Sequence, residues 1–213
     1  LVTGFEPFGG ERVNPSWLIA QALHGRRIGG ARVVSAQLPC VFGAALESLS
    51  QALQRTRPVL VLALGQAAGR AELSLERVAI NVDDARMADN AMACPVDTPV
   101  VPGAPAAYFS TLPIKAMAAA VAKAGLPVAI SQSAGTFVCN HVFYGLQHQL
   151  AATRVRSGFM HVPVLPEQAG EGAAQAGMPS MPLHAMVQGV RIALAAALRH
   201  RGGDLAVTGG AIS

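Results

Sequence analysis

The stretch PVLVLALG, Pro58–Gly65, is a continuous apolar run that begins with a proline and ends with a glycine. Its length fits one β-strand and falls well short of the roughly 18 uncharged residues that a membrane span requires. A helical pattern, Gly43 to Leu53, precedes it along the chain. Buried apolar strands that alternate with helices are typical of a parallel sheet covered on both faces. We therefore expect an α/β fold built around a buried strand from Val59 to Leu64.

Strand and helix patterns alternate along the rest of the chain, with no internal repeat. Asn14-Pro15 marks a helix start, because asparagine is a preferred N-cap and proline suits the first turn. The alternation predicts one domain over residues 1–213, a single-domain three-layer α/β/α sandwich with a mostly parallel twisted sheet. The other predicted strands are Leu1 to Thr3, Arg32 to Gln37, Arg77 to Val82, Val128 to Gln132 and Phe159 to Val164. The other predicted helices are Pro15 to about His24, Pro113 to Ala124, Val138 to Leu150 and Leu183 to Arg199.

Two long segments interrupt this pattern. Residues 83–108 are rich in proline, aspartate and asparagine, and residues 163–182 are rich in glycine, alanine and methionine. Long loops inside a compact domain are often functional, and ligands of such folds bind beyond the carboxyl ends of the strands. We expect both segments to lie near the active site.

Composition argues against several classes of partner. The chain has 213 residues and a formal net charge of +4, but only 13% of its residues are charged. Lysine and arginine are scattered and are not interleaved with aromatic residues, so we expect no nucleic-acid partner. Neither a signal peptide nor an apolar span is visible, so we expect no membrane association. Leu1 already lies inside a strand pattern, and we expect a few residues to precede it.

The three cysteines, Cys40, Cys94 and Cys139, fit neither a zinc module nor a paired disulfide framework. Free cysteines are typical of a reducing compartment, which predicts a cytoplasmic protein. No spacing of histidine, aspartate or glutamate matches a metal site, so we expect no metal and no cofactor. Each cysteine is therefore either a core residue or a reactive thiol, and we expect Cys40 and Cys94 to be structural.

Cys139 lies in the stretch SAGTFVCNHVFYG, Ser133–Gly145, where a strand pattern runs through a turn at Gly135 into a helix. The first turn of a helix has free N–H groups and the positive end of the helix dipole. Both favour a thiolate, so we expect a lowered pKa for Cys139, and the same N–H groups can hold an oxyanion. An isolated cysteine is usually a small buried core residue, and this alternative stays open for Cys139 beside the reactive one.

His161 differs from the other histidines because it lies in an apolar strand pattern, FMHVPV. A histidine there is either a satisfied core residue or a catalytic base. A catalytic histidine is commonly oriented by an acid, and Glu76 before the strand RVAINV and Asp83-Asp84 after it are both candidates. The residues alone leave that choice open. The other histidines fall on predicted helices or near the surface: His24, His141, His148, His184 and His200.

The glycines of GFEPFGG, Gly4–Gly10, suggest a turn that holds a ligand. These glycines could belong to a phosphate-handling or nucleoside-processing α/β protein, but the support is weak, because the motif lacks the Lys-Ser/Thr of a P-loop and the three-glycine spacing of a dinucleotide site. A further alternative to an enzyme is a binding module that has a ligand pocket but no catalytic chemistry.

Four motifs together resemble one family, pyroglutamyl-peptidase type I, also called pyrrolidone-carboxylate peptidase. They are GFEPFGG with the following NPSW, GQAAGR with ERVAINVDDARMADN, SAGTFVCNH, and GFMHVPVLPEQ. They occur in the family's order and span residues 4–168. The resemblance implies a cysteine exopeptidase that removes N-terminal pyroglutamate from peptides through a thioester acyl-enzyme.

The resemblance also implies roles for single residues. The nucleophile falls on Cys139 within TFVCNH, the base on His161 within FMHVP, and the third member of the triad on Glu76 within LERVAIN. Arg86 of DDAR is implied to lie near the scissile carbonyl, with the backbone N–H of Cys139 as an oxyanion donor.

A pocket for the pyroglutamyl ring is implied as well, with pyroglutamyl peptides as substrates. The family further implies a homodimer or homotetramer. The implied pocket residues are Phe5, Phe8, Phe137 and Val138, with Gln66 at the polar edge of the lactam and Asn14 supporting the loop.

Overall fold

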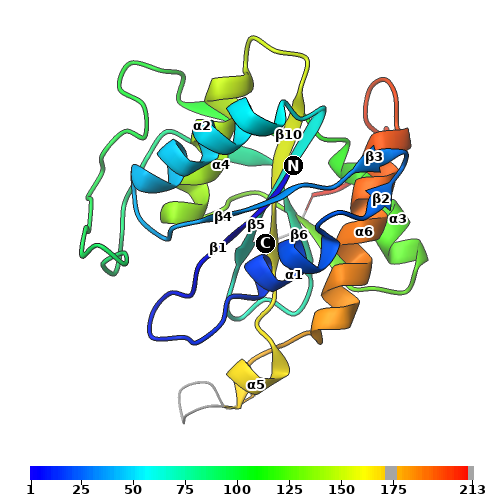
Figure 1. The fold of residues 1–213 in the computed structure, drawn as a ribbon, viewed down its shortest axis with the longest axis horizontal. Helices are drawn as coiled ribbons and strands as arrows, with labels where there is room; N and C mark the ends of the chain where they lie inside the picture. Colours follow the sequence, from blue (N-terminus) through cyan, green and yellow to red (C-terminus); the bar gives the residue numbers. More distant parts are fainter. Residues whose placement is uncertain (171–176, 211–213) are drawn as a thin grey trace.

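The computed structural model describes residues 1–170 and 177–210. Its centre is a sheet that has six strands within those residues, in the order β4, β1, β5, β10, β6, β9 (Figure 1). The first four run parallel, β6 is antiparallel to β10, and β9 is parallel to β6. The predicted α/β fold with a mostly parallel sheet is confirmed. The strands are β1 (Val2–Phe5), β4 (Ser35–Leu38), β5 (Leu60–Gln66), β6 (Leu73–Glu76), β9 (Val128–Ser131) and β10 (Arg156–Val162).

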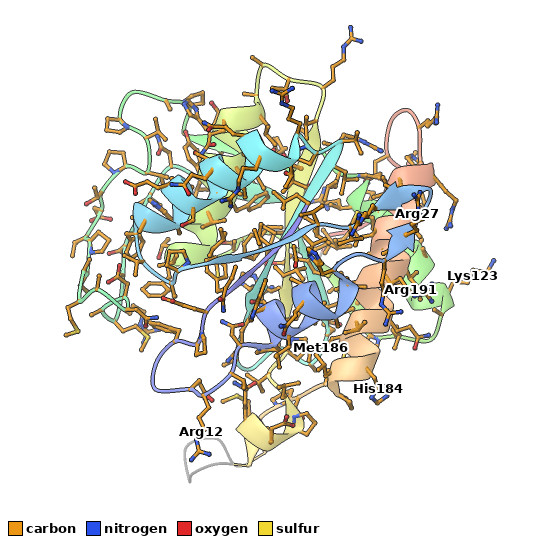
Figure 2. All side chains as sticks on the ribbon, in the orientation of Figure 1. Arg12, Arg27, Lys123, His184, Met186 and Arg191 are labelled. Atoms are coloured by element: carbon orange, nitrogen blue, oxygen red, sulfur yellow. The ribbon has the colours of Figure 1, made fainter. Side chains whose placement is uncertain are left out.

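Helices cover both faces of the sheet, which completes the expected three layers (Figure 1). One apolar cluster joins α1, α3 and α6 to the sheet, and a second joins α2 and α4 to the opposite face. Basic side chains such as Arg27, Lys123 and Arg191 extend outward from the molecule (Figure 2). The helices are α1 (Pro15–Leu23), α2 (Ala44–Thr56), α3 (Ile114–Lys123), α4 (Val138–Leu150) and α6 (Leu183–Arg199).

The start of α1 shows why the opening segment folds as it does. Asn14 is the N-cap, and its side-chain oxygen accepts from the N–H of Ser16 at 3.1 Å. The Ser16 hydroxyl in turn accepts from the N–H of Phe5 at 2.9 Å, which ties the end of β1 to the first turn of the helix. Gly4 allows this close approach, because a Cβ at Gly4 would lie 2.4 Å from the backbone of Ser16.

The predicted strand Arg77 to Val82 is wrong in part. The sheet strand is β6, which ends at Glu76, and β7 (Val78–Ile80) leaves the sheet to pair antiparallel with β8 (Ala107–Phe109). The N–H of Arg77 still bonds to β9, so the chain bends away only after this residue. Glu76 is therefore the last residue of a central strand rather than a residue of a turn.

The predicted strand Arg32 to Gln37 is divided as well. Its first part belongs to a hairpin in which β3 (Ala31–Arg32) pairs antiparallel with β2 (Arg27–Ile28). Gly29 and Gly30 form the turn with φ of 55° and 85°, a backbone conformation that favours glycine. Only the second part, as β4, joins the central sheet.

The segment 83–108 is anchored by polar side chains. The carboxylate of Asp89 accepts from the N–H of Phe42 at 2.9 Å, and just before the segment the side chain of Asn140 bonds to both backbone groups of Ile80 in β7. Of the segment 163–182, residues 171–176 lie outside the described residues, and a short helix that the sequence did not predict, α5 (Pro166–Ala169), follows β10. Within the described chain, no helix is long and apolar enough to cross a membrane.

Candidate active site

Cys139 is the second residue of α4, as the sequence predicted. Its sulfur lies over β5, because a Cβ placed on Gly65 would be 2.8 Å from the Cys139 Sγ atom. Gly65 is the register partner of His161 on the neighbouring strand β10. The start of α4 therefore places the thiol of Cys139 over β5, next to His161 on the neighbouring strand β10.

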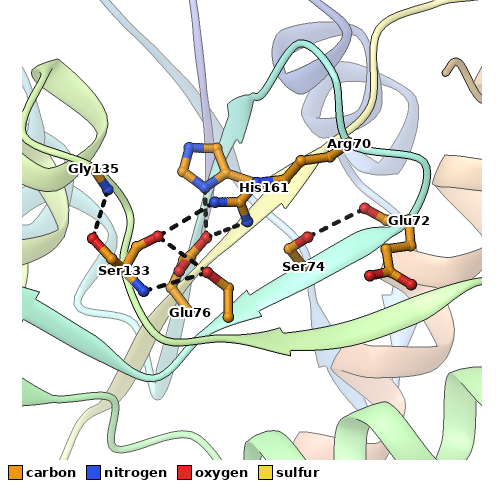
Figure 3. Close-up of polar contacts among 8 residues, drawn as sticks. Arg70, Glu72, Ser74, Glu76, Ser133, Gly135 and His161 are labelled. Atoms are coloured by element: carbon orange, nitrogen blue, oxygen red, sulfur yellow. Dashed lines mark hydrogen bonds and ion pairs between the residues drawn. The ribbon is translucent and has the colours of Figure 1, made fainter. Parts of the chain in front are cut away.

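His161 and Glu76 are hydrogen-bonded to each other in the interior. The Nδ1 atom of His161 lies 2.7 Å from Oε1 of Glu76, whose side chain is fully buried (Figure 3). The same oxygen accepts from Nη1 of Arg70 at 2.8 Å, and Arg70 also donates to the carbonyl of Ser133 at 3.3 Å. Arg70 thus joins Glu76 to the turn that precedes Cys139, a contact that the sequence did not reveal.

The electrostatics of His161 favour a neutral ring at rest. Burial lowers the pKa of His161, the hydrogen bond and charge of Glu76 oppose this shift, and the positive charge of Arg70 lowers the pKa further. A neutral ring with its proton on Nδ1 donates to Glu76 and leaves Nε2 as an acceptor. Figure 3 shows this second nitrogen turned away from the carboxylate. The arrangement suits a general base.

The expected acidic thiol is wrong for the resting site. Burial raises the pKa of Cys139, the neighbouring Cys40 and Glu76 raise it further, and Arg70 opposes them. The surroundings of the sulfur thus favour the protonated thiol. Cys139 is protonated at neutral pH, so attack by its sulfur requires a base that takes the proton during the same step.

A cavity of about 320 Å³ lies beside Cys139, and its wall is mostly apolar. Phe8 and Phe137 pack with ring centroids 5.1 Å apart and form part of that wall. The described residues contain no group of three or more histidine, cysteine or acidic side chains that could hold a metal ion. The lining residues are Phe5, Phe8, Gly9, Glu11, Asn14, Cys40, Gln66, Ala68, Met87, Phe137 and Cys139.

Comparison with known proteins identifies the family of the chain. A family model described as pyroglutamyl peptidase matches residues 1–200. The chain belongs to the pyroglutamyl peptidase family. It is 58% identical to the pyrrolidone-carboxylate peptidase of Cupriavidus taiwanensis, over 96% of this chain and 98% of the relative. It is 52% identical to the enzyme of that name from Yersinia pseudotuberculosis, over 100% of this chain and 98% of the relative.

Solved structures agree with this assignment. The crystal structure of pyroglutamyl peptidase I from Bacillus amyloliquefaciens superposes with a TM-score of 0.93 at 42% identity and covers 97% of both chains. A mutant pyrrolidone carboxyl peptidase from the hyperthermophile Pyrococcus furiosus superposes with a TM-score of 0.89 at 44% identity, over 92% of this chain and 96% of that one. The fold of this pyroglutamyl peptidase family member is thus shown by sequence and by structure.

All but one of the pocket residues implied by the family resemblance lie together. Phe5, Phe8, Asn14, Gln66 and Phe137 all line the cavity. The side chain of Val138 is fully buried and packs in the core beneath α4. Arg86 is exposed and does not line the cavity, although its neighbour Met87 does.

Glu6 of the opening motif gains a role that sequence reasoning missed. Its Oε1 atom accepts from the N–H of Cys40 at 3.0 Å and from the side-chain amide of Asn90 at 2.8 Å. Its backbone carbonyl accepts from Nδ2 of Asn14 at 3.0 Å. One acid therefore connects the loop after β1, the loop after β4 and the segment 83–108, which together surround the cavity.

Asp83, the alternative acid, binds a different histidine. Its Oδ2 atom lies 2.8 Å from Nδ1 of His141, and Nε2 of His141 accepts from the N–H of Gly43 at 3.0 Å. Both ring nitrogens of His141 are thereby occupied by protein groups. Asp83 and His141 anchor the segment 83–108 to α4 and to the start of α2, which leaves Glu76 as the partner of His161.

Proposed function

We propose that this family member removes N-terminal pyroglutamate from peptides, with Cys139 as nucleophile, His161 as base and Glu76 as the acid that orients the base. The observation that carries the proposal is the 2.7 Å bond between Glu76 and His161 beside a thiol at the start of α4. A buried carboxylate bound to Nδ1 fixes the tautomer and stabilises the imidazolium that forms during reaction.

The first step forms a thioester. As Sγ of Cys139 adds to the scissile carbonyl carbon, the thiol proton passes to Nε2 of His161 and an electron pair moves to the carbonyl oxygen. The intermediate then collapses, the C–N bond breaks, and the leaving amine takes its electron pair together with the proton from His161. The raised pKa of Cys139 makes this proton transfer part of the attack.

The second step returns the enzyme to its starting state. Water gives a proton to Nε2 of His161 and adds to the thioester carbon. The C–S bond then breaks, pyroglutamate leaves, and the sulfur of Cys139 regains the proton. The first-turn N–H groups of α4, including that of Cys139, are suited to bind the oxyanion in both steps. The role of Arg86 stays a prediction, since transition-state support requires its side chain to turn into the cavity beside Met87.

The cavity explains selectivity for an uncharged ring. Phe5, Phe8 and Phe137 offer an apolar wall to the lactam, whereas an ordinary N-terminal ammonium would lose its hydration there at a cost of several kcal/mol. A cavity that hydrogen-bonds the lactam carbonyl also rejects a prolyl residue, which lacks this oxygen and leaves a polar partner unpaired.

The test compares hydrolysis of the p-nitroanilides of pyroglutamate and proline. We expect turnover of the first only, and Cys139→Ala should lower kcat by at least about 1,000-fold. Cys94→Ala is the matched control, because Cys94 is exposed and does not line the cavity. Full activity of Cys139→Ala would contradict the assignment, and ligand binding without turnover in the wild type would favour a binding module.

The oligomeric state and the cellular compartment of this protein stay predictions that rest on its family. We infer a homodimer or homotetramer of single-domain subunits in the cytoplasm. Large apolar side chains of the segment 83–108 and of β8 support an interface, since Met92 and Phe109 are 82% and 69% exposed. Light scattering coupled to size-exclusion chromatography measures the mass directly, and a strictly monomeric mass would contradict the inference.

A further inference from the structure

We propose that Gln168 is a positioning residue that sets the orientation of the Gln66 amide, so that Gln66 presents its NH2 group to the substrate cavity. This inference rests on the proposed function, because it assigns the group that recognises the lactam carbonyl. Gln168 does not line the cavity, and it acts through Gln66, which does.

The orientation of the Gln168 amide is determined by its neighbours. The N–H of Leu165 donates to Oε1 of Gln168 at 2.9 Å, and only an oxygen can accept there. On the other side, the Nε2 atom of Gln168 donates to Oε2 of Glu11 at 3.2 Å, and a carboxylate can only accept. Two fixed partners of opposite type therefore prevent this amide from turning over.

This polarity is passed on to Gln66. The Nε2 atom of Gln168 also donates to Oε1 of Gln66 at 3.3 Å, so the oxygen of Gln66 is directed toward Gln168. Among the described residues, no acceptor is bonded to Nε2 of Gln66, and Gln66 lines the cavity. A lactam carbonyl is an acceptor, so it matches an NH2 group and is repelled by the oxygen that a reversed amide would present.

Gln168 also has a simpler role, because it caps a helix. It is the third residue of α5, and its side chain accepts from the backbone N–H of Leu165, the N-cap, as the glutamate or glutamine of a capping box does. Glutamate serves in that motif as well as glutamine does. A pure cap therefore predicts that Gln168→Glu is silent, whereas the positioning role predicts a loss of substrate binding, because a carboxylate has no donor for Gln66.

The experiment measures KM and kcat of Gln168→Glu with pyroglutamyl p-nitroanilide. A carboxylate at this position attracts the NH2 group of Gln66 and turns its oxygen toward the cavity. We expect KM to rise about tenfold and kcat to change less than about threefold, because the ring carbonyl is bound equally in the ground state and the transition state. Inhibition by 2-pyrrolidone, the bare lactam ring, should weaken by the same factor as KM rises.

Two backgrounds separate this role from other effects. Gln168→Glu places a carboxylate beside the carboxylate of Glu11, and Glu11→Gln removes that repulsion. The double variant should still have a KM about tenfold higher than that of Glu11→Gln alone. In Gln66→Ala, Gln168→Glu should have no further effect on KM, because the residue it acts through is absent. The thermal midpoint of each variant reports whether the α5 cap is intact.

Three results would overturn the proposal. They are an unchanged KM in Gln168→Glu, a KM effect that disappears with Glu11→Gln, and a KM effect of equal size in the Gln66→Ala background. The wild-type enzyme separates this outcome from failure of the proposed function. If it hydrolyses the pyroglutamyl amide while one of these results is obtained, only the role of Gln168 is wrong.

Discussion

Replacing Arg70 by methionine is expected to move the acid limb of the pH profile of kcat/KM to higher pH. As the proposed base, His161 must be neutral to take the thiol proton, so activity should be lost as the pH falls through the pKa of its folded state. Arg70 is one of the groups that lower this pKa. Without its charge the pKa of His161 rises, and the loss of activity begins at a higher pH.

The size of the shift follows from the geometry. Nη1 of Arg70 and Nδ1 of His161 bind the same oxygen of Glu76 at 2.8 and 2.7 Å, so these two nitrogens are at most about 5.5 Å apart. Two unit charges at that separation interact by about 3 kcal/mol at an effective dielectric constant of about 20. The Arg70 side chain is 30% exposed, and solvent screening reduces this to roughly half. The expected shift is therefore about one pKa unit.

The assay is the pH dependence of kcat/KM for pyroglutamyl p-nitroanilide, measured from about pH 4.5 to about pH 8 in wild type, Arg70→Met and Arg70→Lys. Lysine keeps the charge but cannot bridge Glu76 and Ser133, so its acid limb should coincide with that of the wild type. Thermal unfolding of each variant shows whether the fold is retained. The reasoning is refuted if the acid limb of Arg70→Met coincides with the wild type, or if Arg70→Lys shifts as far as Arg70→Met.

Two glycines give further predictions. Gly65→Ala places a Cβ 2.8 Å from the sulfur of Cys139 and should lower kcat by about 100-fold with a smaller change in KM, whereas steady-state kinetics equal to wild type would show that the sulfur position tolerates displacement. Gly4→Ala places a Cβ 2.4 Å from the backbone of Ser16, which cannot move without displacing α1. The unfolding free energy should drop by about 3 kcal/mol, and the thermal midpoint by about 10 °C in calorimetry. A midpoint within about 2 °C of wild type would contradict this packing argument.

Much of the fold could be predicted from local patterns. The bounds of α4 and α6 agree with the predicted helices, and Asn14 caps α1 as expected, because periodicity and capping are carried by neighbouring residues. Prediction failed where the chain leaves the sheet. RVAINV has a continuous strand pattern, yet only the pairing of β7 with β8 shows that Val78 onward belongs to a separate ribbon.

The candidate site was predictable to a smaller extent. Cys139 and His161 could be named as candidates from their positions in a helix start and an apolar strand. The choice of acid between Glu76 and Asp83-Asp84 was open until the family resemblance favoured Glu76. The structure brings Glu76 to His161, across 85 positions of sequence, and gives Asp83 to His141. The lowered pKa expected for Cys139 was wrong because a helix start is visible in the sequence and the burial of the sulfur is not.

The sequence by itself determined the five long helices, the strands β1, β5, β9 and β10, the family and the position of the thiol at a strand–helix junction. These features depend on residues that are close along the chain. Only the tertiary structure decided that Arg70 joins Glu76 to the turn before Cys139, that Glu6 connects three loops, and that Gln168 donates to Gln66. These contacts depend on strand register and on burial, which arise when distant segments pack together. The wall of the cavity, including Cys40 and Met87, is fixed by the same packing.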